Sequence, residues 1–510
     1  MIAATGRKAM LAGLLAGGLL AAGADAQTLR IGLQEDPDML DPTLARTFVG
    51  RIVFASLCDK LVDIDPNLGF VPMLATSWTF ADDGRALSFK LRSGVTFHDG
   101  TALDAEAVKA SLERHLTLQG SNRASEIRPI DRIEIAAADE VVLHLKGPFS
   151  PLLAQLSDRA GMIMSKKAIE EAAGGGRPFA QSPVCAGPFR FAERIAQDRI
   201  VLDRYDGYWN KDAIHVDRVI FRPIPDQTVR LANLRSGDLD IIERAAPSDM
   251  PAIKGDRGLA LHTITSLGYQ GITFNIGNGP KAQGPMGQSA KLREALEVAI
   301  DRNVINQVAL DGAHVVGNQP VAPTNPYYAA SVPIPARDVA RAKALMKEAG
   351  HEKVGFELMV ANNPEAQRIG EIILARAGEA GFEIRLNAME FAAALDRQTK
   401  GDFEVFLIGW SGRTDPDGNI HTFTETKGGL NDGKYSNPAV DELLNKARTV
   451  SAVAERKALY EAAFKIFVAQ DRPRVYLYHP NWIYGTRAAV TGFVPYPDGL
   501  IRPFGIRVGG

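Results

Sequence analysis

The order of elements in the second half of the chain places the strongest limit on its fold. Apolar periodicity predicts a helix over Pro364–Ala380 that ends at Gly381 and is followed by a strand over Phe382–Leu386. The same order of helix, glycine and strand occurs over Asp338–Val360. Helices that alternate with strands in this way are typical of a sheet with helical crossover connections. The sequence therefore predicts an α/β fold.

Length and composition limit the organisation and the partners. A chain of 510 residues exceeds what one hydrophobic core usually serves, so two or three domains are expected. The net charge is −2, and lysine and arginine are dispersed without a long basic run. This distribution argues against nucleic acid as the main partner.

The N-terminus has the pattern of a secretory signal peptide. Arg7 and Lys8 precede an apolar run, and Ala24-Asp25-Ala26 fits the small-residue pattern that a signal peptidase cleaves. Cleavage after Ala26 would leave Gln27 first, without a cysteine for a lipid anchor. No later apolar run is long enough to cross a bilayer. We therefore expect an exported, periplasmic protein.

The only two cysteines of the chain are Cys58 and Cys185. In an oxidising compartment such a pair can form a disulfide, which across this loop would stabilise the fold by about 4 to 5 kcal/mol. The alternative is two buried free thiols. The bridge is the favoured interpretation.

The segment Glu404–Ile420, EVFLIGWSGRTDPDGNI, joins a predicted buried strand to a polar loop. The strand ends near Trp410, and Arg413, Asp415 and Asp417 follow in the turn. In open α/β sheets, ligands bind beyond strand ends, so these four residues are candidates for a ligand site. The alternative is an ordinary core tryptophan with a solvated turn.

No metal, cofactor or catalytic site is expected. Asp415, Asp417 and Asn419 alternate as in a calcium loop, but Gly418 comes too early and no glutamate follows at the required distance. The chain contains no HExxH, no G-x-S-x-G, no P-loop and no dinucleotide-binding G-x-G-x-x-G. These absences argue against an enzyme.

Several motifs, in order, resemble the family 5 extracellular solute-binding proteins, which are the dipeptide-, oligopeptide- and nickel-binding components of ABC importers. The motifs are SWTFADDGRALSFKLRSGVTFHDGTALDAEAVKASLERH, AGPFRF, YDGYW, VDRVIFRPIPD, SGDLDI, LREALEVAIDRNVI and the GW...DPDGN stretch. Together they extend over essentially the whole mature chain. The resemblance implies a binding protein without enzymatic activity.

The resemblance also implies a two-lobe periplasmic binding protein fold with mixed sheets, an extra small α/β domain and a hinge between the lobes. Lobe one would comprise residues 27–70, 180–275 and 480–510, the small domain 71–179, and lobe two 276–479. The lobes would be joined near Phe274-Asn275 and Tyr478-His479. Other residues expected to line the interlobe cleft are Gln34, Glu35, Tyr269, Gln270 and Asn362.

Arg413 departs from the pattern of this family. Peptide-binding relatives carry an aspartate three residues after the tryptophan, where it holds the peptide's α-amino group. A guanidinium at this position would repel an ammonium and favour a carboxylate or phosphate. We therefore expect Arg413 to meet an anionic group of the ligand. The alternative is neutralisation by Asp415 or Asp417.

The predicted function is capture of a small solute, peptide-like or acid-bearing, and its delivery to an inner-membrane ABC permease. The protein is expected to be a monomer without a cofactor. An exported hydrolase acting on peptide-like compounds is the alternative, and a chaperone or signalling role is a third. The ligand itself cannot be identified from the sequence.

Overall fold

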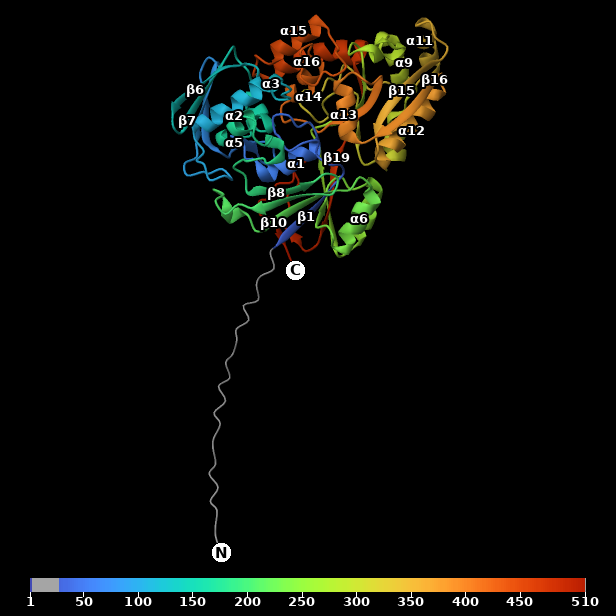
Figure 1. Cartoon of the computed structure of the whole chain (residues 1–510). Helices are drawn as coiled ribbons and strands as arrows, with labels where there is room; N and C mark the ends of the chain where they lie inside the picture. The colour runs from blue at the N-terminus through green and yellow to red at the C-terminus, as the bar shows by residue number, and fades with distance from the viewer. Residues whose placement is uncertain (2–26, 510) are drawn as a thin grey trace.

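The computed structural model describes Met1 and residues 27–509, so the expected signal peptide beyond Met1 lies outside the described residues. The described part contains sheets of seven, six and four strands and two small two-stranded sheets. Figure 1 shows the seven-stranded sheet at the bottom, the four-stranded sheet at the left and the six-stranded sheet at the right. Parallel and antiparallel pairs occur together in the two large sheets, which confirms the predicted α/β fold with mixed sheets.

The seven-stranded sheet is built around the first strand of the mature chain. Its strands, in spatial order, are β12 (Leu259–Thr265), β19 (Asn481–Arg487), β11 (Ile241–Ile242), β1 (Thr28–Leu33), β10 (Arg218–Pro223), β9 (Arg199–Arg204) and β8 (Phe189–Ile195). The helices of this part are α1 (Phe48–Leu57), α6 (Gln227–Ser236) and α7 (Met250–Gly255). Leu29 and Ile31 of β1 are buried in one core with Ile52 and Phe54 of α1. β1 lies inside the sheet between two parallel neighbours, and its side chains alternate between partly exposed and buried from Thr28 to Ile31.

The four-stranded sheet is antiparallel and has its own core. Its strands are β4 (Ala75–Phe80), β5 (Ala86–Leu91), β7 (Glu140–Leu145) and β6 (Ile130–Ala137), and its helices are α2 (Ala105–Thr117), α3 (Ala124–Ile127), α4 (Leu152–Leu156) and α5 (Lys166–Ala173). Asp104 caps α2 because its carboxylate accepts a hydrogen bond from Ala107 N at 2.9 Å. Val108 and Leu112 of this helix pack with Phe89 of β5.

The six-stranded sheet contains the alternating elements that define the second half of the chain. Its strands are β14 (Val315–Val316), β18 (Arg474–His479), β13 (Tyr269–Phe274), β17 (Val405–Trp410), β15 (Val354–Ala361) and β16 (Phe382–Met389). Its main helices are α9 (Ala290–Ala299), α11 (Val339–Glu348), α12 (Pro364–Gly378), α13 (Phe391–Thr399), α14 (Asp417–Thr424), α15 (Pro438–Ala447) and α16 (Val453–Ile466). Gly381 joins α12 to β16 with a φ of 115°, which L-residues rarely adopt.

The chain passes between the two large sheets at two adjacent points. Residues 266–268 connect β12 of the seven-stranded sheet to β13 of the six-stranded sheet, and Pro480 connects β18 to β19 in the opposite direction. Ser266 N donates to Pro480 O at 3.1 Å, so the two crossings lie side by side. The crossing expected near His479 lies next to Pro480. The crossing expected at Phe274-Asn275 is one strand too late, because β13 pairs with β17 and β18 of the six-stranded sheet.

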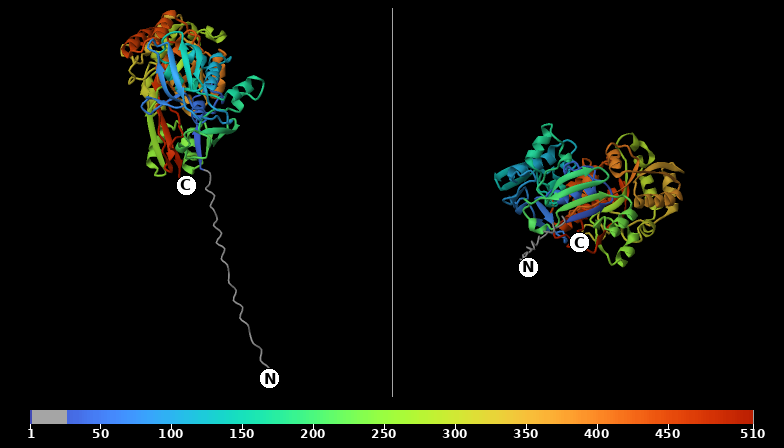
Figure 2. Two further views of the ribbon diagram at one scale, coloured as in Figure 1. Left: turned by 90° about the vertical axis from the view of Figure 1, so that its left-hand side faces the viewer. Right: turned by 60° about the horizontal axis from the view of Figure 1, so that its bottom comes forward.

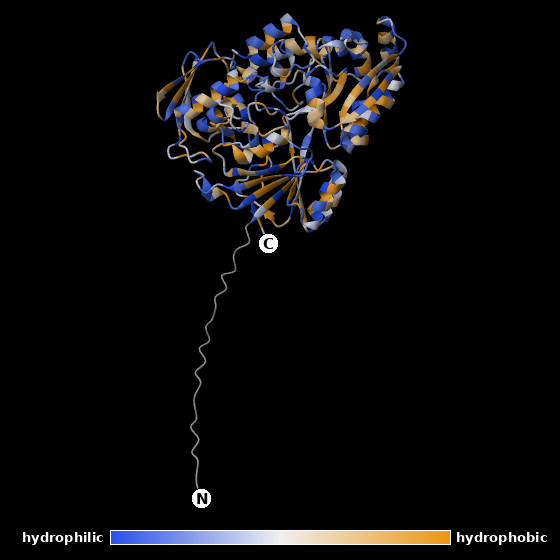
Figure 3. Cartoon of the chain, in the orientation of Figure 1, coloured by the Kyte–Doolittle hydropathy of each residue, from blue (hydrophilic) through white to orange (hydrophobic). Residues whose placement is uncertain are grey.

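The glycine-rich run Gly277–Gln288 comes after β13, so it does not connect the two large sheets. It contains the short helices η5 (Pro280–Gln283) and α8 (Pro285–Gln288) and follows β13 within the second lobe. Figure 2 shows the yellow and orange elements of this lobe on the side opposite to the blue and cyan elements. Figure 3 shows hydrophobic colour along the strands of the large sheets, where the cores lie.

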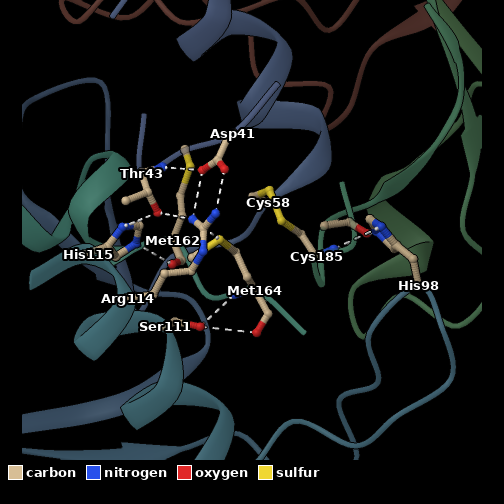
Figure 4. The surroundings of a disulfide bond; sticks show 11 residues. Asp41, Thr43, Cys58, His98, Ser111, Arg114, His115, Met162, Met164 and Cys185 are labelled. Atoms are coloured by element: carbon tan, nitrogen blue, oxygen red, sulfur yellow. Dashed lines mark hydrogen bonds and ion pairs between the residues drawn. A yellow bond between two sulfur atoms is a disulfide. The ribbon is translucent and has the colours of Figure 1, made fainter. Parts of the chain in front are cut away.

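Cys58 and Cys185 form a disulfide with a Cα–Cα distance of 4.9 Å. Cys58 ends α1, and Cys185 pairs with Met164 in an isolated bridge before β8. Figure 4 shows the bond beside Met164 and the ion pair of Arg114 with Asp41. The four-stranded sheet lies within the closed loop, so the disulfide joins its two connections to the first lobe.

Candidate functional site

A cavity of about 190 Å³ lies between the two large sheets. Both sheets contribute because strand ends point into it. Gln34 and Glu35 follow β1, Tyr269 begins β13, and Trp410 ends β17. The remaining lining residues are Arg46, Phe48, Arg123, Arg244, Ala245, Pro247, Gln270, His314, Ala361, Asn363, Glu365, Ala366, Phe391, Leu395, Gln398, Leu407, Ile408, Gly409, Ser411, Phe423, Leu430, Asp432, Arg474, Tyr478, Pro480, Asn481, Trp482 and Ile483.

Five of the residues expected in a cleft line this cavity, namely Gln34, Glu35, Tyr269, Gln270 and Trp410. Asn362 does not, because its side chain is exposed after the last residue of β15. Its neighbour Asn363 lines the cavity instead and caps α12 through a hydrogen bond from Ala366 N at 2.9 Å. The prediction was therefore wrong by one residue. Near a strand end, side chains of successive residues point in opposite directions, so Asn363 faces the cavity and Asn362 does not.

The other three candidates, Arg413, Asp415 and Asp417, are outside the cavity lining. Asp415 accepts two hydrogen bonds from Arg456, each 2.8 Å long. Asp417 accepts two from Arg448, at 2.7 and 2.9 Å. Bidentate pairs of this kind fix the loop between β17 and α14. The acids are therefore neutralised by Arg456 of α16 and by Arg448, which directly follows α15.

Arg413 is buried, with 5% of its surface exposed. Its Nε lies 3.4 Å from an oxygen of Asp158, and its guanidinium stacks over the ring of Trp410 at 4.2 Å. Neither Asp415 nor Asp417 is its ion-pair partner. The structure therefore does not place Arg413 where it would contact a ligand in the cavity.

Arg474 is a buried, charged lining residue that was not predicted from the sequence. It is 7% exposed, and Nη1 donates to the hydroxyl of Tyr269 at 3.0 Å. The guanidinium also lies 5.2 Å from the ring of Tyr269 and 5.0 Å from that of Phe423. Among the described residues, no carboxylate lies within ion-pair distance of it. A charged residue at the start of the apolar run RVYLYH was the available signal.

The other arginines of the cavity have acidic partners. Arg244 pairs with Glu35 at 3.2 Å and with Glu243 at 2.6 Å. Burial raises the pKa of Glu35, although Arg244 opposes this rise. Arg46 pairs with Asp432 at 2.6 Å. Arg474 therefore differs from Arg46 and Arg244 in having a buried charge without a carboxylate partner.

Contacts across the cavity join the two lobes. Arg46, from the segment before α1, pairs with Asp432 and donates hydrogen bonds to Leu395 O and Thr399 Oγ1 of α13. Arg51 Nη1 donates to Ser411 Oγ at 2.8 Å, and Gln227 donates to Glu365 at 3.4 Å. These contacts require the lobes to be close together. The structure therefore represents a closed arrangement.

The Arg46–Asp432 pair provides a test of this arrangement. Replacing Arg46 by alanine should weaken solute binding by about 1 to 2 kcal/mol, because a partly buried pair present only in the closed form is lost. The control is Arg341→Ala, which removes an ion pair with Glu294 inside one lobe. Calorimetry that finds equal affinities in both variants would show that the pair does not stabilise closure.

The described residues contain no group of three or more side chains able to hold a metal ion. Within the same range, no helix is long and apolar enough to cross a membrane. The sequence profile described as "Bacterial extracellular solute-binding proteins, family 5 Middle" matches residues 69–431. That match spans more than half of the chain. The chain belongs to this family.

Named relatives agree with this assignment. The chain is 28% identical to the glutathione-binding protein GsiB of Pectobacterium atrosepticum over 476 residues, covering 90% of each chain. It is 27% identical to the dipeptide-binding protein of Escherichia coli over 515 residues, covering 94% of each. Among solved structures, the periplasmic binding protein AgaA of Agrobacterium tumefaciens in complex with agropinic acid superposes with a TM-score of 0.87 at 25% identity, covering 95% of this chain and 99% of that one.

Membership of family 5 establishes the general role of the chain. It is a solute-binding protein of an ABC importer, and it binds peptides or other small solutes. Its relatives are binding components of transporters rather than enzymes. The two-lobe fold with a cavity between the lobes agrees with this role.

Proposed function

We propose that this family 5 protein captures an acid-bearing, peptide-like solute in the interlobe cavity and delivers it, as a periplasmic monomer, to an inner-membrane permease. The observation that carries the proposal is Arg474. A buried guanidinium without a carboxylate partner is costly unless a ligand supplies the missing anion. A carboxylate can accept two hydrogen bonds from the planar guanidinium.

The ligands for which the relatives are named support this choice. Glutathione, dipeptides and agropinic acid all carry a carboxylate. The aromatic rings of Tyr269, Trp410 and Phe423 would provide the apolar wall for the rest of the solute. Arg474 would fix the orientation of the acidic end against this wall.

The proposal is tested by titrating solute-stripped protein with pairs of compounds that differ only at the acid. Glutathione, dialanine and their carboxamide counterparts are suitable probes. We expect each carboxylate form that binds to bind at least tenfold more tightly than its amide, a difference of about 1.4 kcal/mol. Amides that bind as tightly as acids, or no binding by any acid of the panel, would contradict an acid-selective site.

Export and maturation are part of the proposal. The pattern of residues 7–26 supports cleavage after Ala26. Gln27 is held at the start of the fold, because its backbone N donates to Asp217 at 2.9 Å. An exported protein whose first residue differs from Gln27 would contradict this cleavage site.

A hydrolase receives no support from the cavity residues. Ser411 accepts a hydrogen bond from Arg51, and the lining histidine His314 stacks on Tyr478 and accepts from Asn481 N at 3.1 Å. A serine nucleophile needs a base within hydrogen-bond reach, and Ser411 has an arginine there instead. Release of product from peptides or esters by the purified protein would overturn this assignment.

A further inference from the structure

Four arginines gather beside the cavity around only two carboxylates. Arg413 Nε lies 3.4 Å and Arg159 Nε 3.6 Å from Asp158, and Arg51 also pairs with Asp158. The fourth arginine, Arg123, pairs with Glu126. We call Arg51, Arg123, Arg159 and Arg413 the arginine cluster.

The arginine cluster is buried and carries an excess of positive charge. None of its four arginines and neither of its two carboxylates is more than 5% exposed. Four guanidinium groups against two carboxylates leave an excess of two positive charges. Asp415 and Asp417 cannot compensate, because they are engaged by Arg456 and Arg448.

Several donors of the arginine cluster have no partner among the described residues. Nε and Nη2 of Arg123, Nε and Nη2 of Arg159, Nε of Arg51 and Nη2 of Arg413 make no hydrogen bond. Burial lowers the pKa of Arg413 to about 10, and the neighbouring Arg51 contributes to the decrease while Asp158 opposes it. Uncompensated buried charge and unpaired donors both destabilise a protein. An anion in contact with these groups would relieve both costs.

The arginine cluster reaches the cavity at one place. Arg123 lines the cavity, and so does Ser411, whose hydroxyl receives the hydrogen bond of Arg51. Trp410, next to Ser411 in the chain, also lines the cavity and carries the guanidinium of Arg413 on its ring. The positive charge of the arginine cluster therefore lies next to the part of the cavity that is lined by Arg123 and Ser411.

This end differs from the place occupied by Arg474. Arg474 packs against Tyr269 and Phe423, whereas Arg413 packs against Trp410. Phe423 contacts both Tyr269 and Trp410, with ring centroids 6.4 and 4.8 Å away. The aromatic wall therefore contacts Arg474 through Tyr269 and Phe423, and the arginine cluster through Trp410.

We propose that Arg123 and Ser411, backed by the arginine cluster, form a second oxyanion subsite, so that the solute carries two acidic groups, one at Arg474 and one at Arg123. The inference rests on the function proposed above and makes it narrower. A carboxylate, phosphate or sulfonate oxygen would accept hydrogen bonds from the free donors of Arg123. A free ammonium would be repelled at this end, which selects against solutes that present one there.

Co-crystallisation of solute-stripped protein with selenate tests both subsites, because selenium marks the oxyanion by anomalous scattering. We expect one anomalous peak within hydrogen-bond distance of Arg123 and Ser411 and a second beside Arg474. A peak beside Arg474 with only water at Arg123 would overturn the second subsite and leave the proposed function intact. The absence of a peak beside Arg474 would count against the proposed function itself.

A variant separates the subsite from adventitious binding. Arg123→Gln should abolish the peak at Arg123 and leave the peak at Arg474, and Arg474→Gln should do the reverse. A selenate peak near Ser411 that persists in Arg123→Gln would overturn the assignment. If Arg123→Gln does not fold, the wild-type crystal alone decides whether an oxyanion binds at Arg123 and Ser411.

Discussion

Replacing Arg474 by glutamine should weaken binding of the transported solute by about 2 to 5 kcal/mol, or roughly 30- to 4,000-fold. The expected loss is large because a charge-assisted pair in a desolvated cavity would be removed. Titration calorimetry of solute-stripped protein with the solute that co-purifies with the wild type measures it.

The same substitution, Arg474→Gln, should not lower the thermal stability of the ligand-free protein. Arg474 has no carboxylate partner among the described residues, so glutamine removes an uncompensated buried charge. The melting temperature of ligand-free Arg474→Gln should therefore be equal to or above that of the wild type. Arg385→Gln is the matched control, since it removes a guanidinium whose side chain is 74% exposed on β16. Equal affinities of Arg474→Gln and Arg385→Gln would remove Arg474 from the site.

Loss of the disulfide should cost about 4 to 5 kcal/mol of unfolding free energy by the loop-entropy relation. The bond joins positions 127 residues apart and closes the loop that contains the four-stranded sheet. Opening it would allow the unfolded chain many more conformations. The double variant Cys58→Ser/Cys185→Ser should therefore unfold at a much lower urea concentration than the oxidised wild type.

Reduction of the wild type provides the control for the serine variant. Both sulfur atoms belong to residues buried in the core of the first lobe, so the substitutions also change packing slightly. Reductant should move the wild type towards the urea midpoint of the double variant and leave the double variant unchanged. A double variant within about 1 kcal/mol of the oxidised wild type would contradict the loop-entropy account.

Local sequence patterns were sufficient to predict the strand ends that form the cavity. The apolar run before Trp410 and the polar residues after it predicted a strand that ends at a site, and Trp410 lines the cavity. Gln34 and Glu35 also follow a strand and line the cavity, but they were expected there because of the family resemblance. Strand ends are local features, so they can be inferred without knowledge of the tertiary contacts.

The electrostatic part of the site could not be predicted in this way. Whether an arginine faces a ligand or a carboxylate depends on contacts between distant segments. Arg413 pairs with Asp158 of the small domain, whereas Arg474 pairs with no acid among the described residues. The sequence pointed to Arg413, which lies outside the cavity lining, whereas Arg474 lines the cavity, and the expected anionic ligand remains part of the proposal.

Native mass spectrometry of protein purified without denaturation tests most directly whether Arg474 binds an acid-bearing solute. The expected result is a small acidic molecule bound to the wild type and to Arg385→Gln and lost from Arg474→Gln. A bound molecule without an acidic group, or one that Arg474→Gln retains as fully as the wild type, would contradict the proposed site.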